Sequence, residues 1–229
     1  MDWGAVVVAA GRGTRMGAAD NKPYLLLAGR PVLAHSLEAF ERCPTVASVV
    51  LVVAPGEEVR AAEVVNHYAF QKVVAIVPGG AERQDSVYAG LVALETEGVL
   101  VHDAARPLIT SKQITACCEA VEKHGAAALA VPVKDTIKVS DGNGLMVATP
   151  DRSTLWSVQT PQASSRAVLI QAHQLARELG VAATDDTMLL ERAGHQVAIV
   201  EGSYSNIKIT TPEDLPIAEL LLARQQGEE

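Results

Sequence analysis

Residues 4–17 read GAVVVAAGRGTRMG, an apolar run that passes directly into a loop with three glycines. The run over 4–9 is rich in valine, and continuous apolar character is typical of a strand covered on both faces. The loop contains Gly11, Gly13 and Gly17. These glycines permit a sharp turn and allow backbone N–H groups to approach an anion. The stretch therefore predicts a buried strand that ends at a site for a negatively charged group.

The loop differs from two common phosphate-binding motifs. It is not a Walker A loop, because no Gly-Lys-Ser/Thr follows, and it fails the GxGxxG pattern of NAD-dependent oxidoreductases because position 16 is Met. Residues 1–35 carry four cations against two anions, although the whole chain has a formal net charge of −8; the four cations are Arg12, Arg15, Lys22 and Arg30. A glycine loop with several cations suits a triphosphate better than the diphosphate of a dinucleotide.

Further strands and helices alternate outward from this loop. Apolar runs predict strands at 47–53, 72–77, 98–102, 126–132 and 196–200. Amphipathic stretches predict helices at 31–42, 57–66, 82–96, 111–124, 164–179, 185–193 and 212–225, the last with Thr211 as N-cap and Pro212 at its first position. This order predicts an α/β fold with a mostly parallel sheet and helices on both faces.

The alternation breaks at about residue 133. The segment 134–158 contains the tight-turn sequence DGNG between two short alternating runs, IKV and LMV. It predicts a projecting β-hairpin that is too short to form its own core.

The composition limits the classes of protein to which the chain can belong. The chain has 229 residues, with 27 acidic against 19 basic side chains and 3% aromatic residues, which argues against charge-driven nucleic-acid binding. No apolar run approaches the roughly 18 residues of a membrane helix, and the N-terminus lacks a basic n-region. Cys43, Cys117 and Cys118 form no disulfide framework or CxxC knuckle, and the six histidines show no metal-ligand spacing. We therefore expect a single cytoplasmic domain over 1–229, with no nucleic-acid or membrane partner and no metal site built from protein ligands.

The chain also resembles a known family. GxGxRM followed by Lys22 in NKPY is similar to the nucleotidyltransferase signature of sugar-nucleotide pyrophosphorylases. Seven further motifs follow in order: GGAERQDSV at 79–87, VHDAARP at 101–107, DTIK at 135–138, DR at 151–152, QTPQ at 159–162, ATDD at 183–186 and EGSYSNIKIT at 201–210. Together they resemble the 2-C-methyl-D-erythritol 4-phosphate cytidylyltransferase family. The resemblance implies a Rossmann-like nucleotidyltransferase domain that transfers CMP from CTP to methylerythritol 4-phosphate in isoprenoid biosynthesis, with Mg²⁺ bound mainly through the CTP phosphates.

The resemblance also implies roles for particular residues. The catalytic cations would be Arg15, Lys22 and Lys208: Arg15 and Lys22 would hold the triphosphate, and Lys22 and Lys208 would act at the α-phosphate. The nucleotide-binding residues would be Ala10, Gly11, Gly13, Gly80, Ser86 and Asp103, with Gly80 and Ser86 at the cytosine. Position 81 is alanine where some members carry aspartate, so the backbone must read the base here if that carboxylate reads it in those members.

The acceptor side and the assembly follow from the same resemblance. Arg106, Thr136, Arg152, Thr160 and Thr184 would contact methylerythritol 4-phosphate. The 134–158 hairpin would be a dimerisation arm that embraces a second subunit, so that Thr136 and Arg152 complete the partner's site in a homodimer.

Two alternatives remain open. Ribitol 5-phosphate cytidylyltransferase shares the fold and the chemistry and differs in the acceptor, and a test of both acceptors separates the two. An inactive nucleotide-binding protein on the same fold is the other alternative. The presence of Arg15, Lys22 and Lys208 argues against it, because a binder needs fewer transition-state cations.

Overall fold

A seven-stranded sheet forms the centre of the computed structural model, which describes residues 1–11 and 21–227. The strand order is β11-β7-β10-β6-β1-β4-β5. The strands are β1 (Trp3–Ala9), β4 (Val46–Val53), β5 (Val73–Pro78), β6 (Gly98–Asp103), β7 (Ala126–Pro132), β10 (Trp156–Ser165) and β11 (Ala198–Glu201). All neighbouring pairs are parallel except those of β10, which runs antiparallel to β6 and β7. The prediction of a mostly parallel sheet is confirmed.

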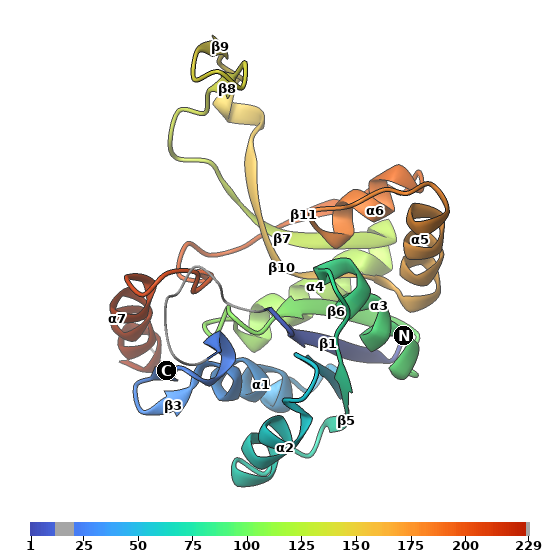
Figure 1. The fold of residues 1–229 in the computed structure, drawn as a ribbon, viewed down its shortest axis with the longest axis vertical. Helices are drawn as coiled ribbons and strands as arrows, with labels where there is room; N and C mark the ends of the chain where they lie inside the picture. Colours follow the sequence, from blue (N-terminus) through green and yellow to red (C-terminus); the bar gives the residue numbers. More distant parts are fainter. Residues whose placement is uncertain (12–20, 228–229) are drawn as a thin grey trace.

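Helices cover both faces of this sheet (Figure 1). One face packs against α1 (Val32–Arg42), α2 (Glu58–His67) and α4 (Ser111–His124), and the other against α3 (Arg83–Ala93), α5 (Arg166–Glu178) and α6 (Asp186–Arg192). Ala5 and Val7 of β1 enter the first core, whereas Val6 enters the second. Because successive strand residues point to opposite faces, the continuous valine run fills both cores.

The last helix, α7 (Asp214–Gly227), packs on a smaller apolar cluster with Leu27, Val32, Leu108 and Ile209. Leu27 belongs to the short strand β2 (Leu26–Leu27), which pairs with β3 (Arg30–Pro31) just after the single turn η1 (Lys22–Tyr24). No helix among residues 1–11 and 21–227 has the length and apolar character needed to cross a bilayer.

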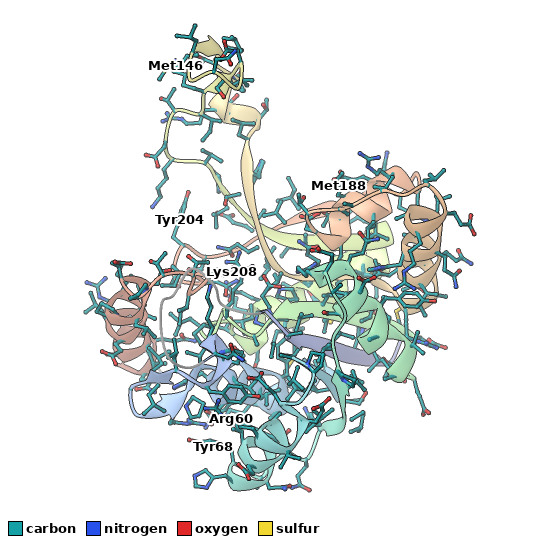
Figure 2. All side chains as sticks on the ribbon, viewed as in Figure 1. Arg60, Tyr68, Met146, Met188, Tyr204 and Lys208 are labelled. Carbon is teal, nitrogen blue, oxygen red and sulfur yellow. The ribbon has the colours of Figure 1, made fainter. Side chains whose placement is uncertain are left out.

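A hairpin arm projects from one end of the sheet (Figure 1). It contains β8 (Val139–Ser140), β9 (Met146–Ala148) and the turn η2 (Arg152–Thr154), and β8 pairs antiparallel with β9. Figure 2 shows Met146 at the tip of the arm and Tyr204 near its base. The arm exposes large apolar side chains, including Leu145, Met146 and Val147 at 67%, 74% and 60%. The predicted hairpin is confirmed, although residues 156–158 belong to the central strand β10 rather than to the arm.

Several boundaries differ from the sequence-based expectation, and α3, for example, ends at Ala93 rather than 96. β10 was not predicted, and it occupies the chain up to Ser165, so α5 starts at Arg166 rather than 164. Helix α7 starts at Asp214 instead of 212. The Asp214 carboxylate accepts hydrogen bonds from the backbone N–H groups of Thr210 and Thr211, which holds the preceding turn outside the regular helix.

Candidate active site

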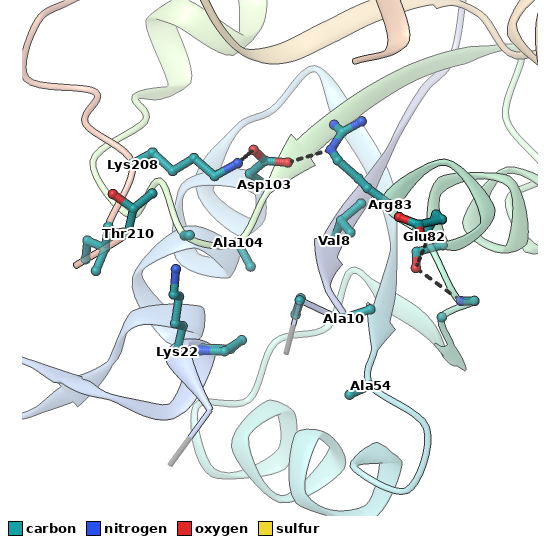
Figure 3. Close-up of a pocket in the computed structure, with 18 of the residues that line it drawn as sticks. Val8, Ala10, Lys22, Ala54, Glu82, Arg83, Asp103, Ala104, Lys208 and Thr210 are labelled. Carbon is teal, nitrogen blue, oxygen red and sulfur yellow. Dashed lines mark hydrogen bonds and ion pairs between the residues drawn. The ribbon is translucent and has the colours of Figure 1, made fainter. Parts of the chain in front are cut away.

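A cleft opens where β1, β4, β5 and β6 end at their carboxyl edge, the usual place for ligands in open α/β sheets. Its cavity volume is about 620 Å³. The sequence-predicted residues that line it are Ala10, Gly11, Lys22, Gly80, Ser86, Asp103 and Lys208. Figure 3 shows that Lys22 and Lys208 enter from different elements. The predicted Gly13 and Arg15 lie outside the described residues.

The segment between β5 and α3 forms a close-packed wall of the cleft. A Cβ atom on Gly79 would lie 2.5 Å from the Cβ of Ala10 and 2.6 Å from the Oγ of Ser86, so only glycine fits there. The Gly80 N–H donates to the Ser86 hydroxyl at 3.1 Å, and that hydroxyl donates to the Glu82 carbonyl at 3.1 Å. Glu82 also caps α3 in a reciprocal box with Asp85. Ser86 therefore fixes the backbone of the wall, and Ala81 lines the cleft without a carboxylate.

Asp103, at the end of β6, is the charged centre of the cleft. Its Oδ2 accepts from Lys208 Nζ at 2.7 Å, and its Oδ1 accepts from Arg83 Nε at 3.2 Å. Burial alone would raise the pKa of Asp103, but Arg83 and Lys208 outweigh it and hold that pKa well below its usual range. Asp103 is therefore an anion held between two cations.

A buried hydrogen-bond chain fixes the backbone on either side of Asp103. The Asp103 N–H donates to the Thr160 hydroxyl at 3.1 Å, and that hydroxyl lies 3.0 Å from His102 Nδ1. His102 Nε2 donates to the Arg106 carbonyl at 3.1 Å, so in the neutral ring Nδ1 accepts from the Thr160 hydroxyl. Burial lowers the pKa of His102 to about 4. Thr160, expected at the acceptor substrate, is buried and lies in this chain of bonds rather than in the cleft lining.

The other residues assigned to the acceptor substrate lie apart from the cleft lining. Arg106 is partly buried and donates to the Asn206 carbonyl at 2.8 Å, close to the strand ends that carry the site. Thr184 is exposed just before α6. Thr136 and Arg152 are exposed on the arm, where Arg152 donates to the Lys134 carbonyl at 2.7 Å. The structure therefore brings together the nucleotide-side residues, and it places these two arm residues away from their own chain's cleft.

Two residues of the site were missed in the sequence analysis. Arg83 lines the cleft and joins Asp103 to Asp186 of α6. The two missed residues are Arg83, which lies in GGAERQDSV, and Asp186, which lies in ATDD. Both motifs carry the family resemblance, and the position of a charged residue within them was the signal that could have identified each one.

Comparison with known proteins identifies the family. The model of the IspD family, 2-C-methyl-D-erythritol 4-phosphate cytidylyltransferase, matches residues 4–224. The chain belongs to this family. It is therefore an enzyme of the nucleotidyltransferase class, with the activity that the family name states.

Individual IspD relatives agree with the family match. A 2-C-methyl-D-erythritol 4-phosphate cytidylyltransferase of Pelotomaculum thermopropionicum is 54% identical over 226 residues, covering 97% of this chain and 95% of its own. A bifunctional IspD/IspF enzyme of Desulforudis audaxviator is 59% identical over 95% of this chain, which spans only 56% of that protein. The crystal structure of 4-diphosphocytidyl-2C-methyl-D-erythritol synthase from Anaerococcus prevotii matches with a TM-score of 0.85 at 31% identity, covering 96% of each chain.

Proposed function

We propose that this cleft transfers CMP from CTP to 2-C-methyl-D-erythritol 4-phosphate and releases pyrophosphate, using Lys22 and Lys208 as its catalytic cations. The observation that carries the assignment of residues is that both lysines line the same cavity as the glycine-rich strand ends. Asp103 stands beside Lys208 in that cavity. The reaction is inferred from membership of the family, and the cleft contains lysines of the kind that this reaction needs.

The reaction is an electrostatic problem rather than one of proton transfer. The attacking group is a phosphate oxygen with a second pKa near 6, so it is mostly dianionic at pH 7 and needs no general base. Two polyanions must approach each other, and charge must be neutralised at the α-phosphate during in-line attack. Lys22 and Lys208 would bind the α-phosphate region, while the backbone at Gly11 and Gly80 would hold the nucleotide.

The side chains of the cleft indicate how a magnesium ion would be bound. Within 1–11 and 21–227, no group of three or more His, Cys, Asp or Glu side chains is placed to bind a metal, and both Asp103 oxygens already accept from cations. These residues fit an ion carried mainly by the triphosphate oxygens, with Glu82 and Asp103 as the carboxylates of the cleft lining. Bound there, Mg²⁺ would neutralise part of the phosphate charge.

The arm suggests how the acceptor half of the site is completed. Thr136 and Arg152 lie on an arm whose exposed apolar side chains, such as Met146 and Leu145, suit contact with another protein surface. We infer that the chain is a single domain over 1–229 that forms a homodimer, and that 134–158 carries these two residues into the partner's cleft beside Arg106. The cytoplasm fits both the nucleotide substrate and the three free cysteines.

Pyrophosphate release tests the assignment directly. Each of the four NTPs is crossed with methylerythritol 4-phosphate and ribitol 5-phosphate in the presence of Mg²⁺. CTP with methylerythritol 4-phosphate should give the fastest turnover. Faster turnover with ribitol 5-phosphate would reassign the acceptor, and absence of turnover with every pair would refute the catalytic assignment.

A further inference from the structure

Arg83 joins two carboxylates that belong to different parts of the chain. It is the first residue of α3, and its Nε donates to Asp103 Oδ1 at 3.2 Å while its Nη1 donates to Asp186 Oδ2 at 2.8 Å. Its side chain is 28% exposed, against 11% for Asp103 and 1% for Asp186. The result is a row of alternating charge formed by Lys208, Asp103, Arg83 and Asp186, of which Figure 3 shows the first three.

Asp186 is not required by the local structure of its helix. The N-cap of α6 is Asp185, whose side chain accepts from the Met188 N–H, so the helix end is satisfied without Asp186. The Asp186 carboxylate is almost fully buried, and in the described chain it pairs with Arg83 and lies 3.5 Å from His173 Nε2. A buried ion pair is weak evidence for stability, because desolvation of the two charges offsets their attraction. Stability therefore does not explain why the Arg83–Asp186 pair is buried, and the other partner of Arg83, Asp103, has to be considered.

The cleft provides that explanation. Lys208 Nζ donates to Asp103 Oδ2 at 2.7 Å. The lysine ammonium has three N–H donors, so a lysine that binds the triphosphate shares its charge between a phosphate oxygen and this carboxylate. Lys208 then neutralises Asp103 less completely, at a site where an unpaired charge is costly.

We propose that Arg83 is a positioning residue that compensates the charge of Asp103 when Lys208 binds the triphosphate, and that Asp186 holds Arg83 in place for this role. The proposal rests on the assignment of Lys208 to the CTP phosphates. Arg83 then acts on the nucleotide through Asp103 and Lys208. Without Arg83, Asp103 would retain Lys208 more strongly, and CTP would have to compete for it.

The test is a double-mutant cycle on CTP affinity, measured by calorimetry with Mg²⁺ so that it does not depend on turnover. Arg83→Gln should weaken CTP binding by about tenfold or more, because it removes one partner of a buried, hydrogen-bonded charge pair. In an Asp103→Asn background, which removes the charge that Arg83 compensates, the same substitution should have little further effect. An equal loss in both backgrounds would overturn the proposal, because it would mean that Arg83 acts independently of Asp103.

Companion variants separate positioning from folding. Asp186→Asn, nearly the same size, should weaken CTP binding in the same direction, and wild-type affinity in this variant would overturn its part of the proposal. Arg83→Lys keeps the charge but cannot reach both carboxylates with a planar fork, so it should recover affinity only in part. Arg177→Gln is the matched control: Arg177 pairs with Asp85 of α3 at 3.3 Å, outside the cleft lining, and its loss should leave CTP affinity unchanged.

The same proteins distinguish failure of this proposal from failure of the proposed function. If wild type released no pyrophosphate yet bound CTP with the predicted coupling, the positioning role would stand and the reaction would be wrong. If wild type were active but the cycle were additive, the reaction would stand and the role of Arg83 would be wrong.

Discussion

Mixing two inactive variants tests whether each active site is shared between subunits. Lys22 lines the cleft of its own chain, whereas Arg152 lies exposed on the arm and does not. If the arm reaches a second subunit, Lys22→Ala and Arg152→Ala homodimers are each inactive at both sites. In a heterodimer of the two, one site collects both lesions and the other collects none.

The size of the recovery follows from pairing statistics. Unfolding and refolding the two variants at equal concentration gives about half heterodimers, each with one intact site, so about a quarter of all sites are intact. Pyrophosphate release should therefore recover to roughly a quarter of the wild-type rate per chain. Two affinity tags on the two variants allow the heterodimer to be isolated and verified.

A matched control uses two lesions from the same side of the site. Lys22 and Lys208 both line the cleft of one chain, so mixed Lys22→Ala and Lys208→Ala proteins leave one lesion in every site and should recover nothing. Recovery in this control would show that the cleft assignment is wrong. A verified Lys22/Arg152 heterodimer without recovered activity would refute the shared site.

Two further predictions concern single residues. Lys22→Ala and Lys208→Ala should each lower kcat by on the order of 10²–10³, which is the loss expected for one preorganised charge-stabilising group. Both variants should keep a normal circular dichroism spectrum. A near-wild-type kcat in either variant would show that the lysine is not catalytic. His102 has a folded pKa of about 4, below the unfolded value of 6.5, so its contribution to stability is present above pH 6.5 and is lost as pH falls toward 4, by up to roughly 3 kcal/mol. Urea denaturation at pH 4 to 7 should show a shallower pH dependence for His102→Gln than for wild type, and equal slopes would contradict this reading.

The strands with a continuous apolar pattern were predictable because both of their faces are covered by helices. β1 and β4 follow this rule, with valines in two separate cores. Their ends also predicted the place of the cleft, since carboxyl ends of parallel strands meet at one edge. Local sequence was sufficient here because burial on both faces leaves a signal in every residue.

β10 carries no such signal. Its buried half contains Gln159, Thr160, Gln162 and Ser164 around Pro161, a pattern that resembles a loop. These polar side chains are buried because distant segments satisfy them. Gln162 Oε1 accepts from the N–H groups of Asp186 and Thr187, and Gln159 Nε2 donates to the Ser203 carbonyl. Such a strand is recognisable only once its partners, 24 to 44 positions away in the chain, are in place.

The charged centre of the site could be predicted only in part, because its ion pairs also join distant parts of the chain. Asp103 and Lys208 stood out through the motifs around them, but their direct pairing joins residues 105 positions apart. In the sequence VHDAARP, Arg106 stands three positions after Asp103 and is the nearest cation along the chain. Arg106 instead donates to the Asn206 carbonyl, and Asp103 pairs with Lys208 and Arg83. Which cation reaches a carboxylate depends on tertiary geometry that motif spacing does not contain.

The two ends of the arm lie next to segments that lead to the Lys208–Asp103 pair. Where the chain leaves β7, the Pro132 carbonyl accepts from the Tyr204 hydroxyl at 2.7 Å, and Tyr204 lies four residues before Lys208 (Figure 2). Where the chain returns, β10 runs from the base of the arm to Thr160, whose hydroxyl accepts from the Asp103 N–H. The base of the arm is therefore hydrogen-bonded to the segment that leads to Lys208, and the strand that leaves the arm is hydrogen-bonded to the backbone of Asp103. A shift at Pro132 would strain the first of these hydrogen bonds, and a shift of β10 would strain the second. A subunit that binds the arm would thus restrict the catalytic pair of the chain that extends it, in addition to receiving that chain's Arg152.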